Sequence, residues 1–199
     1  MISSKLNSLK RKFREIDRLK QVIENQKKTL QSLAMEYVSM GDQALDPGES
    51  GVVGEGSAPY GKRLDDIALR SALANYNKAL RIVPDCVDAM IGKAKLMMAL
   101  DQLETASQEL EKALQLDKNN YLALLTMGEL MEAQRDMPQA IKSYKKAAKA
   151  DKKRPEPHDR LQVIYEKIGL EDLAEDEQDI ADRLRKALYN KVNKRKRNK

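Results

Sequence analysis

A 34-residue period runs through this 199-residue sequence and limits the folds that it can adopt. One alanine series follows the period, and a second series lies seven residues upstream of it. The two series are Ala79, Ala113, Ala147, Ala181 and Ala72, Ala106, Ala140, Ala174. A small residue on the apolar face of a helix lets a second helix approach closely, and Tyr76, Leu110 and Tyr144 supply larger contacts. An ordinary helical bundle needs no fixed interval, so the period indicates a helical repeat.

Turn and capping residues keep the same register. Gly41 and Gly169 stand where the first helix of a pair is expected to turn into the second. The segments 101–104 and 136–139 read as capping boxes, with Asp101 and Asp136 as the side-chain acceptors at two helix starts. Each unit is therefore expected to be helix, turn, helix, turn.

This pattern resembles the tetratricopeptide repeat (TPR) over about residues 30–187. The matching positions are Gly128 with Met131, Ala34 with Tyr37, Ala140 with Tyr144, and Pro84 at the end of one repeat. The departures are Met97 and Met131 in place of Tyr, and Lys118 and Lys152 in place of Pro. The resemblance implies an all-α fold, a TPR α-α superhelix of about four helix-turn-helix repeats. A long coiled-coil-like helix is expected to precede it, on the separate evidence given below.

The first repeat is interrupted by a glycine-rich insertion at residues 46–63. Its composition predicts a flexible loop. The string from Gly56 to Lys62 has the spacing of a phosphate-binding loop, but Arg63 replaces the hydroxyl residue that would ligate magnesium. No apolar strand precedes the string, so a linker is expected rather than a nucleotide site.

Residues 1–29 are predicted to form a basic amphipathic helix that continues into the first repeat, since no glycine or proline interrupts residues 3–40. Apolar residues at alternating three- and four-residue steps form a coiled-coil stripe, here named the N-terminal seam, in which Lys20 and Lys27 fill two positions. Its apolar members are Leu6, Leu9, Phe13, Ile16, Ile23 and Leu30. A partner helix, a second copy of the chain or the chain's own repeats could cover this seam.

Part of this helix also resembles a basic helix by which an alternative eukaryotic translation initiation factor and a Mago-binding protein touch the small ribosomal subunit. The residues in common are Leu9, Lys10, Lys12, Ile16, Leu19 and Lys20. The resemblance implies a ribosome contact, although a short helix rich in lysine and leucine also recurs by chance.

Charge is distributed unevenly along the chain. Residues 1–30 hold nine basic and three acidic side chains, residues 183–199 hold nine basic and none acidic, and the part between is acidic. Residues 188–199 are predicted to be a basic disordered tail, which could contact phosphates, act as a nuclear-import signal or only aid solubility. The expected nucleic-acid or phosphate contacts are Lys10, Arg11, Lys12, Arg14, Lys194, Arg195, Lys196 and Arg197.

TPR arrays bind partners through the concave surface that the first helix of each pair lines. Projecting the register gives a predicted peptide groove that is apolar at one end and acidic at the other, which suits a basic amphipathic segment. Its members are Ile91, Lys95, Met98, Leu122, Leu125, Glu129, Glu132, Asp159, Val163 and Glu166. Some of these side chains could instead pack neighbouring repeats or face solvent.

Catalysis finds no support in the residues. His158 has no nearby nucleophile, and Cys86 is the only cysteine, so neither a disulfide framework nor a zinc site is expected. We expect no cofactor and no metal. No apolar run is long enough for a membrane span, and an intracellular location, cytoplasmic or nuclear, is expected. The predicted function is a non-catalytic TPR scaffold or adaptor, with an RNA- or ribosome-associated factor as the alternative.

Overall fold

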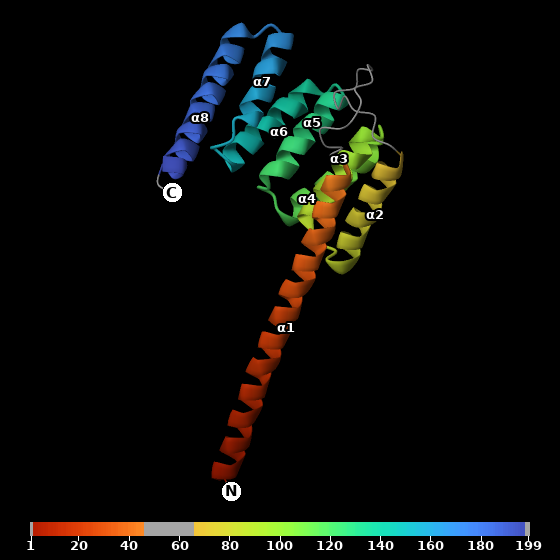
Figure 1. The fold of residues 1–199 in the computed structure, drawn as a ribbon, viewed down its shortest axis with the longest axis vertical. Coiled ribbons are helices and arrows are strands. Elements are labelled where there is room, and N and C mark those ends of the chain that lie inside the picture. Colours follow the sequence, from red (N-terminus) through yellow and green to blue (C-terminus); the bar gives the residue numbers. More distant parts are fainter. Residues whose placement is uncertain (1, 46–65, 198–199) are drawn as a thin grey trace. The chain divides into compact units, whose positions relative to one another are not determined.

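The computed structural model describes residues 2–45 and 66–197, and these residues form helices and no strand (Figure 1). The predicted all-α, TPR-like fold is confirmed, because the helices follow one another as four pairs with the expected period. The predicted loop at residues 46–63 lies outside the described residues. The helices are α1 (Ile2–Leu45), α2 (Asp66–Ile82), α3 (Val87–Ala99), α4 (Leu103–Leu116), α5 (Tyr121–Ala133), α6 (Met137–Ala150), α7 (Glu156–Lys167) and α8 (Glu171–Arg197).

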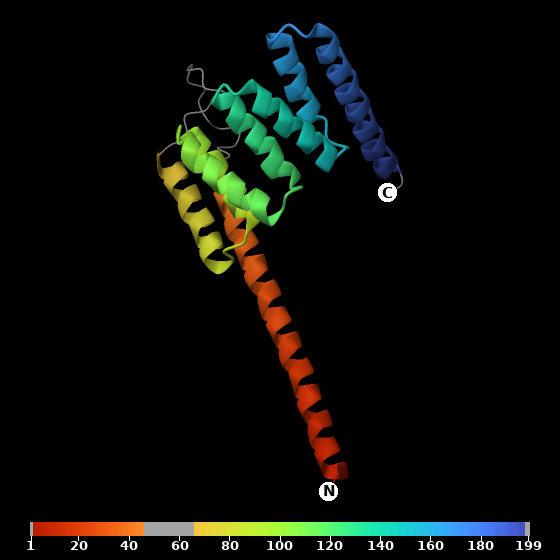
Figure 2. The same ribbon diagram turned by 180° about the vertical axis from the view of Figure 1, so that it is seen from behind.

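The chain divides into two compact units, and the first contains α1, α2 and the start of α3 as far as Ala89. Here α2 lies alongside the C-terminal part of α1, as Figures 1 and 2 both show. The contact centres on Tyr76, which is fully buried and donates a hydrogen bond from its hydroxyl to Asp42 Oδ1 at 2.7 Å. Ala34 and Val38 are also buried on α1. The predicted continuous N-terminal helix is confirmed as a single helix of 44 residues.

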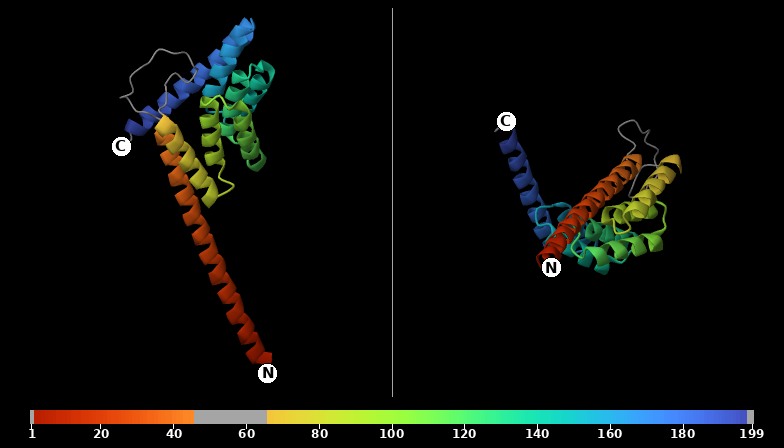
Figure 3. Two further views of the ribbon diagram at one scale, coloured as in Figure 1. Left: turned by 90° about the vertical axis from the view of Figure 1, so that its right-hand side faces the viewer. Right: turned by 90° about the horizontal axis from the view of Figure 1, so that it is seen from below.

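The second unit begins at Met90 and contains the helices from the rest of α3 to α8. Contacts join α4 to α5, α5 to α6, α6 to α7 and α7 to α8, so the helices from α4 to α8 each pack on the next one in the chain (Figure 3). A buried cluster from α6, α7 and α8 forms part of the core, with Leu125 and Met131 of α5 packed against it. Its members are Ala140, Tyr144, Leu161, Ile164, Tyr165 and Ala174.

The 34-residue period also appears in the backbone at the turn inside three pairs. Asp101, Arg135 and Gly169 have φ angles of 58°, 63° and 76° and so lie in the left-handed region. In each turn the next residue's N–H bonds back five residues, for example Gln102 to the Met97 carbonyl at 2.8 Å. This is a Schellman helix ending, which satisfies carbonyls that the helix leaves unpaired.

These turns correct two details of the sequence reading. Asp136 caps α6 as predicted, accepting the Gln139 N–H at 3.1 Å. Asp101 does not cap α4, because it occupies the left-handed position that ends α3 and Gln102 precedes the helix instead. Gly41 is not a turn residue: it lies inside α1, where a Cβ atom would come within 2.6 Å of the Tyr76 ring.

The C-terminal end differs from the predicted tail. Helix α8 continues through Arg197, whereas the sequence reading placed disorder from residue 188. The segment contains no glycine or proline, and lysine and arginine are good helix formers, so their charge alone does not end the helix.

Candidate interaction surfaces

The predicted groove residues divide into accessible and buried sets. Lys95, Leu122, Val163 and Glu166 are exposed, and Leu125, Glu129, Glu132 and Asp159 are half-buried. Ile91 and Met98 are buried at 1% and 8% exposure, so neither side chain is accessible to a partner. Most residues of α3 from Ala89 to Met98 are buried, so Lys95 is the one predicted groove residue of this helix that is exposed.

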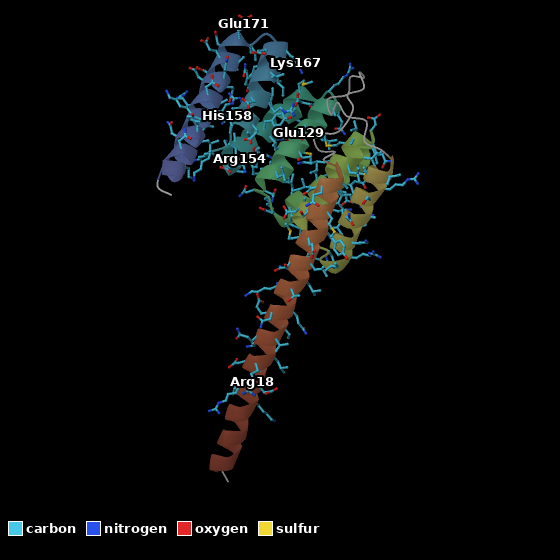
Figure 4. All side chains as sticks on the ribbon, in the orientation of Figure 1. Arg18, Glu129, Arg154, His158, Lys167 and Glu171 are labelled. Carbon is cyan, nitrogen blue, oxygen red and sulfur yellow. The ribbon has the colours of Figure 1, made fainter. Side chains whose placement is uncertain are left out.

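Two groove carboxylates on α5 are held by neighbouring helices. Glu132 accepts a hydrogen bond from the buried Tyr144 hydroxyl at 2.5 Å, and burial together with this bond raises the pKa of Tyr144 well above its ordinary value. Glu129 pairs with Arg160 of α7 at 3.3 Å (Figure 4 labels Glu129). The positions of these acidic side chains are therefore fixed by contacts within the repeats.

A second polar set joins α7 to α8. His158 Nδ1 lies 2.6 Å from Glu177 Oε2, and both side chains are largely buried. Asp159 forms an ion pair with Arg185, which also contacts Asp182 at 2.6 Å. The carboxylate of Asp159 thus contributes to the packing of the last helix pair, and among the α7 groove residues Val163 and Glu166 remain exposed.

A basic hollow on the second unit was missed by the sequence reading. Lys118, Lys146 and Lys149 line a cavity of about 480 Å³ together with Asn119, Leu124 and Ala150, and none of these lining residues is acidic. The sequence reading treated residues 31–182 as one acidic body. The signal that could have revealed the hollow is the composition of α6, which contains four lysines and no Asp or Glu.

The N-terminal seam is open to solvent where its side chains are described, from residue 12 onward. Phe13, Ile16, Ile23 and Leu30 are 66%, 46%, 64% and 48% exposed. The predicted seam members Leu6 and Leu9 lie on α1, but their side chains are outside the described set.

The residues that were predicted to contact phosphates lie on helices at both ends of the chain. Lys12 and Arg14 are exposed on α1, and Lys10 and Arg11 belong to the same helix. The basic residues at 194–197 lie in the last turns of α8, with side chains outside the described set. The two groups belong to different units of the chain.

Features of a catalytic site are sparse in the described part of the chain. No group of three potential metal ligands occurs within residues 2–45 and 66–197. Cys86 is buried, and burial raises the pKa of its thiol, which favours the less nucleophilic protonated form. None of the described helices is long and apolar enough to cross a membrane.

Comparison with known proteins identifies the fold and nothing narrower. No family model matches the chain, and no curated protein matches its sequence. A crystal structure of MamA aligns with a TM-score of 0.61 at 16% identity, covering 82% of this chain and 86% of that one. PilF of Pseudomonas aeruginosa aligns with a TM-score of 0.64 at 19% identity, covering 78% of this chain and 63% of that one. Both are TPR superhelices, so the likeness supports a TPR-like repeat fold for this chain.

Proposed function

We propose that this protein is a non-catalytic interaction scaffold or adaptor that binds a basic amphipathic peptide or helix along the first helices of its repeats. The observation that carries the proposal is the pairing of exposed apolar side chains with exposed or half-buried carboxylates on α5 and α7. Leu122 and Val163 are 37% and 40% exposed, and Glu129 and Glu166 lie on the same two helices. Apolar anchors flanked by carboxylates suit a partner helix with one apolar and one basic face.

Neighbouring contacts support a rigid binding face. Leu125 packs against the buried cluster of the last repeats, and Glu132 is held by Tyr144. A preordered surface loses less side-chain entropy when a partner binds, which favours affinity. The half-buried groove residues therefore serve as the base of the surface, and the exposed ones serve as its contacts.

The test is a titration of the full chain with a fluorescent basic amphipathic peptide. Leu122→Lys and Glu166→Lys together should weaken binding by about tenfold or more, since they remove an apolar contact and reverse a charge. The matched control is Leu116→Lys with Glu111→Lys, which makes the same two changes at exposed positions of α4, a second helix. Equal affinities for the groove variant, the control and the unaltered protein would refute the groove as the binding surface.

A second candidate function, contact with RNA or the ribosome, is favoured by the basic hollow on α6. Lys118, Lys146 and Lys149 line one cavity without an acidic lining residue, an arrangement that attracts a phosphate group. The basic ends would add further phosphate contacts.

This candidate predicts salt-dependent binding of a single-stranded RNA oligonucleotide. Lys146→Glu with Lys149→Glu should lower the slope of log affinity against log salt by about 1 for each phosphate that the variant no longer neutralises. Lys167→Glu with Lys186→Glu is the control, because it makes the same charge change away from the hollow. An equal slope change in both variants would assign the effect to net charge and exclude a site at the hollow.

A further inference from the structure

The exposed half of α1 continues the helix face that is already used for packing. In the C-terminal part of this helix, Ala34 and Gly41 are buried and Tyr76 of α2 lies against Gly41. Steps of three and four residues lead back from Ala34 to Leu30, Ile23 and Ile16, so these side chains lie on the same face. The seam is thus a helix-packing surface that α2 covers only in part.

The contacts between α1 and α2 show how much of this face of α1 is covered by α2. The contacts from α2 reach α1 at Tyr37, over whose ring Lys78 lies at 5.3 Å, and at Gly41 and Asp42. The more N-terminal part of α1 extends past α2 in both ribbon views (Figures 1 and 2). A large apolar side chain there, Leu19 at 53% exposure, flanks the seam and widens the open stripe.

Charge within the stripe limits what can cover it. Lys20 and Lys27 fill two seam positions seven residues apart, and both are exposed. A lysine at such a position becomes partly desolvated when a second helix packs on it, which is unfavourable unless a carboxylate lies opposite. Residues 12–30 hold six basic and three acidic side chains, so the surroundings of the seam are also net basic.

A second copy of the chain fits this charge pattern poorly in either direction. A parallel copy in register sets Lys20 against Lys20 and Lys27 against Lys27 of the other chain. An antiparallel copy sets Lys20 and Lys27 against seam positions of the other chain, and none of these positions from Phe13 to Leu30 holds a carboxylate. Neither arrangement places a carboxylate of the seam opposite these lysines, which disfavours the dimer.

We propose that the N-terminal seam binds an acidic amphipathic helix of another protein. This helix lies along α1 beyond the end of α2, covers Ile16 and Ile23 with its apolar face, and sets carboxylates opposite Lys20 and Lys27. The residues of this surface differ from those of the peptide groove on α5 and α7, and its partner carries the opposite charge.

The experiment uses the full chain and two synthetic helical peptides of about four heptads, the length over which a heptad pattern indicates a coiled coil. Both peptides have leucine and isoleucine in the seam, and they differ only in bearing Glu or Lys at the two positions that face Lys20 and Lys27. Fluorescence anisotropy should show one-to-one binding of the Glu peptide at least about tenfold tighter than that of the Lys peptide.

Charge exchange then tests the assigned residues. Lys20→Glu with Lys27→Glu should invert the preference between the two peptides. Arg14→Glu with Arg18→Glu makes the same net charge change on a face of α1 away from the seam (Figure 4 labels Arg18) and should preserve the preference. An unchanged preference in the first variant, or inversion in both, would overturn the proposal.

Two further measurements identify the occupant. Sedimentation of the chain alone should show a monomer, and a micromolar dimer that Ile23→Asp dissociates would overturn the proposal in favour of a second copy. A photo-crosslinker at Leu19 in living cells should join α1 to a net-acidic helical segment of another protein, and a basic or non-helical segment would overturn the proposal. Leu122→Lys with Glu166→Lys should leave binding of the Glu peptide unchanged, so failure of the groove proposal is distinguishable from failure at the seam.

Discussion

Replacing Gly128 by alanine tests how the third helix pair is held together. A Cβ atom at this position would lie 2.6 Å from Cδ1 and 2.7 Å from Cζ of Tyr144, inside the 3.0 Å limit for such contacts. The ring has no exposed surface and its hydroxyl bonds to Glu132, so it has no space into which it can shift. The substitution therefore overpacks a site that the 34-residue period places opposite a large side chain.

The expected magnitude combines three contributions. Overpacking a core costs about 1–3 kcal/mol, and distorting a hydrogen bond to a charged acceptor costs about 1 kcal/mol or more. Alanine stabilises the helix by about 1 kcal/mol relative to glycine, because its helix propensity is higher. We expect Gly128→Ala to lower the free energy of unfolding by about 2 kcal/mol, which corresponds to a fall of roughly 4–8 °C in Tm.

The second repeat of the chain supplies the matched control. Residues 34 positions earlier are Ala94 and Leu110, and both are fully buried. The double variant Gly128→Ala with Tyr144→Leu reproduces that combination. Urea unfolding should show that Gly128→Ala leaves the free energy of unfolding unchanged in the Tyr144→Leu background. The coupling energy between the two positions is then about 2 kcal/mol. An equal cost in both backgrounds would show that the approach of the ring to Gly128 does not determine stability.

Further predictions concern turns, tyrosines and a buried carboxylate. Gly169→Ala should destabilise the chain by about 1 kcal/mol and Arg135→Gly should stabilise it by about 0.5 kcal/mol in thermal melts, because both backbones are left-handed. Burial raises the pKa of Tyr76 and Tyr144, so unfolded tyrosines ionise first above about pH 10. The free energy of unfolding should then fall by about 1.4 kcal/mol per pH unit for each tyrosine, and a flat alkaline profile would contradict this. Glu109→Ala should cost about 1–3 kcal/mol in urea unfolding by leaving the partly buried Lys93 ammonium unpaired, and a matched loss in Glu111→Ala would refute this.

The sequence alone was sufficient to predict the 34-residue repeat and the continuous N-terminal helix. The alanines at 34-residue intervals are local requirements of close helix packing, and Ala79, Ala113 and Ala147 are all fully buried in the structure. The absence of glycine and proline from residues 3–40 likewise allowed one helix to be predicted. Such features depend on backbone propensity and periodicity, which the order of residues specifies directly.

Positions that depend on neighbouring helices were decided only by the tertiary structure. Gly41 looks like a turn residue in the sequence, yet the ring of Tyr76, 35 positions away, requires it inside a helix. Ile91 and Met98 project onto a groove by register but are buried. The lysine hollow was also missed, because Lys118 joins Lys146 and Lys149 only after α5 and α6 pack together. Periodicity specifies the face of a helix on which a residue lies, whereas exposure and clustering depend on which other segments cover that face.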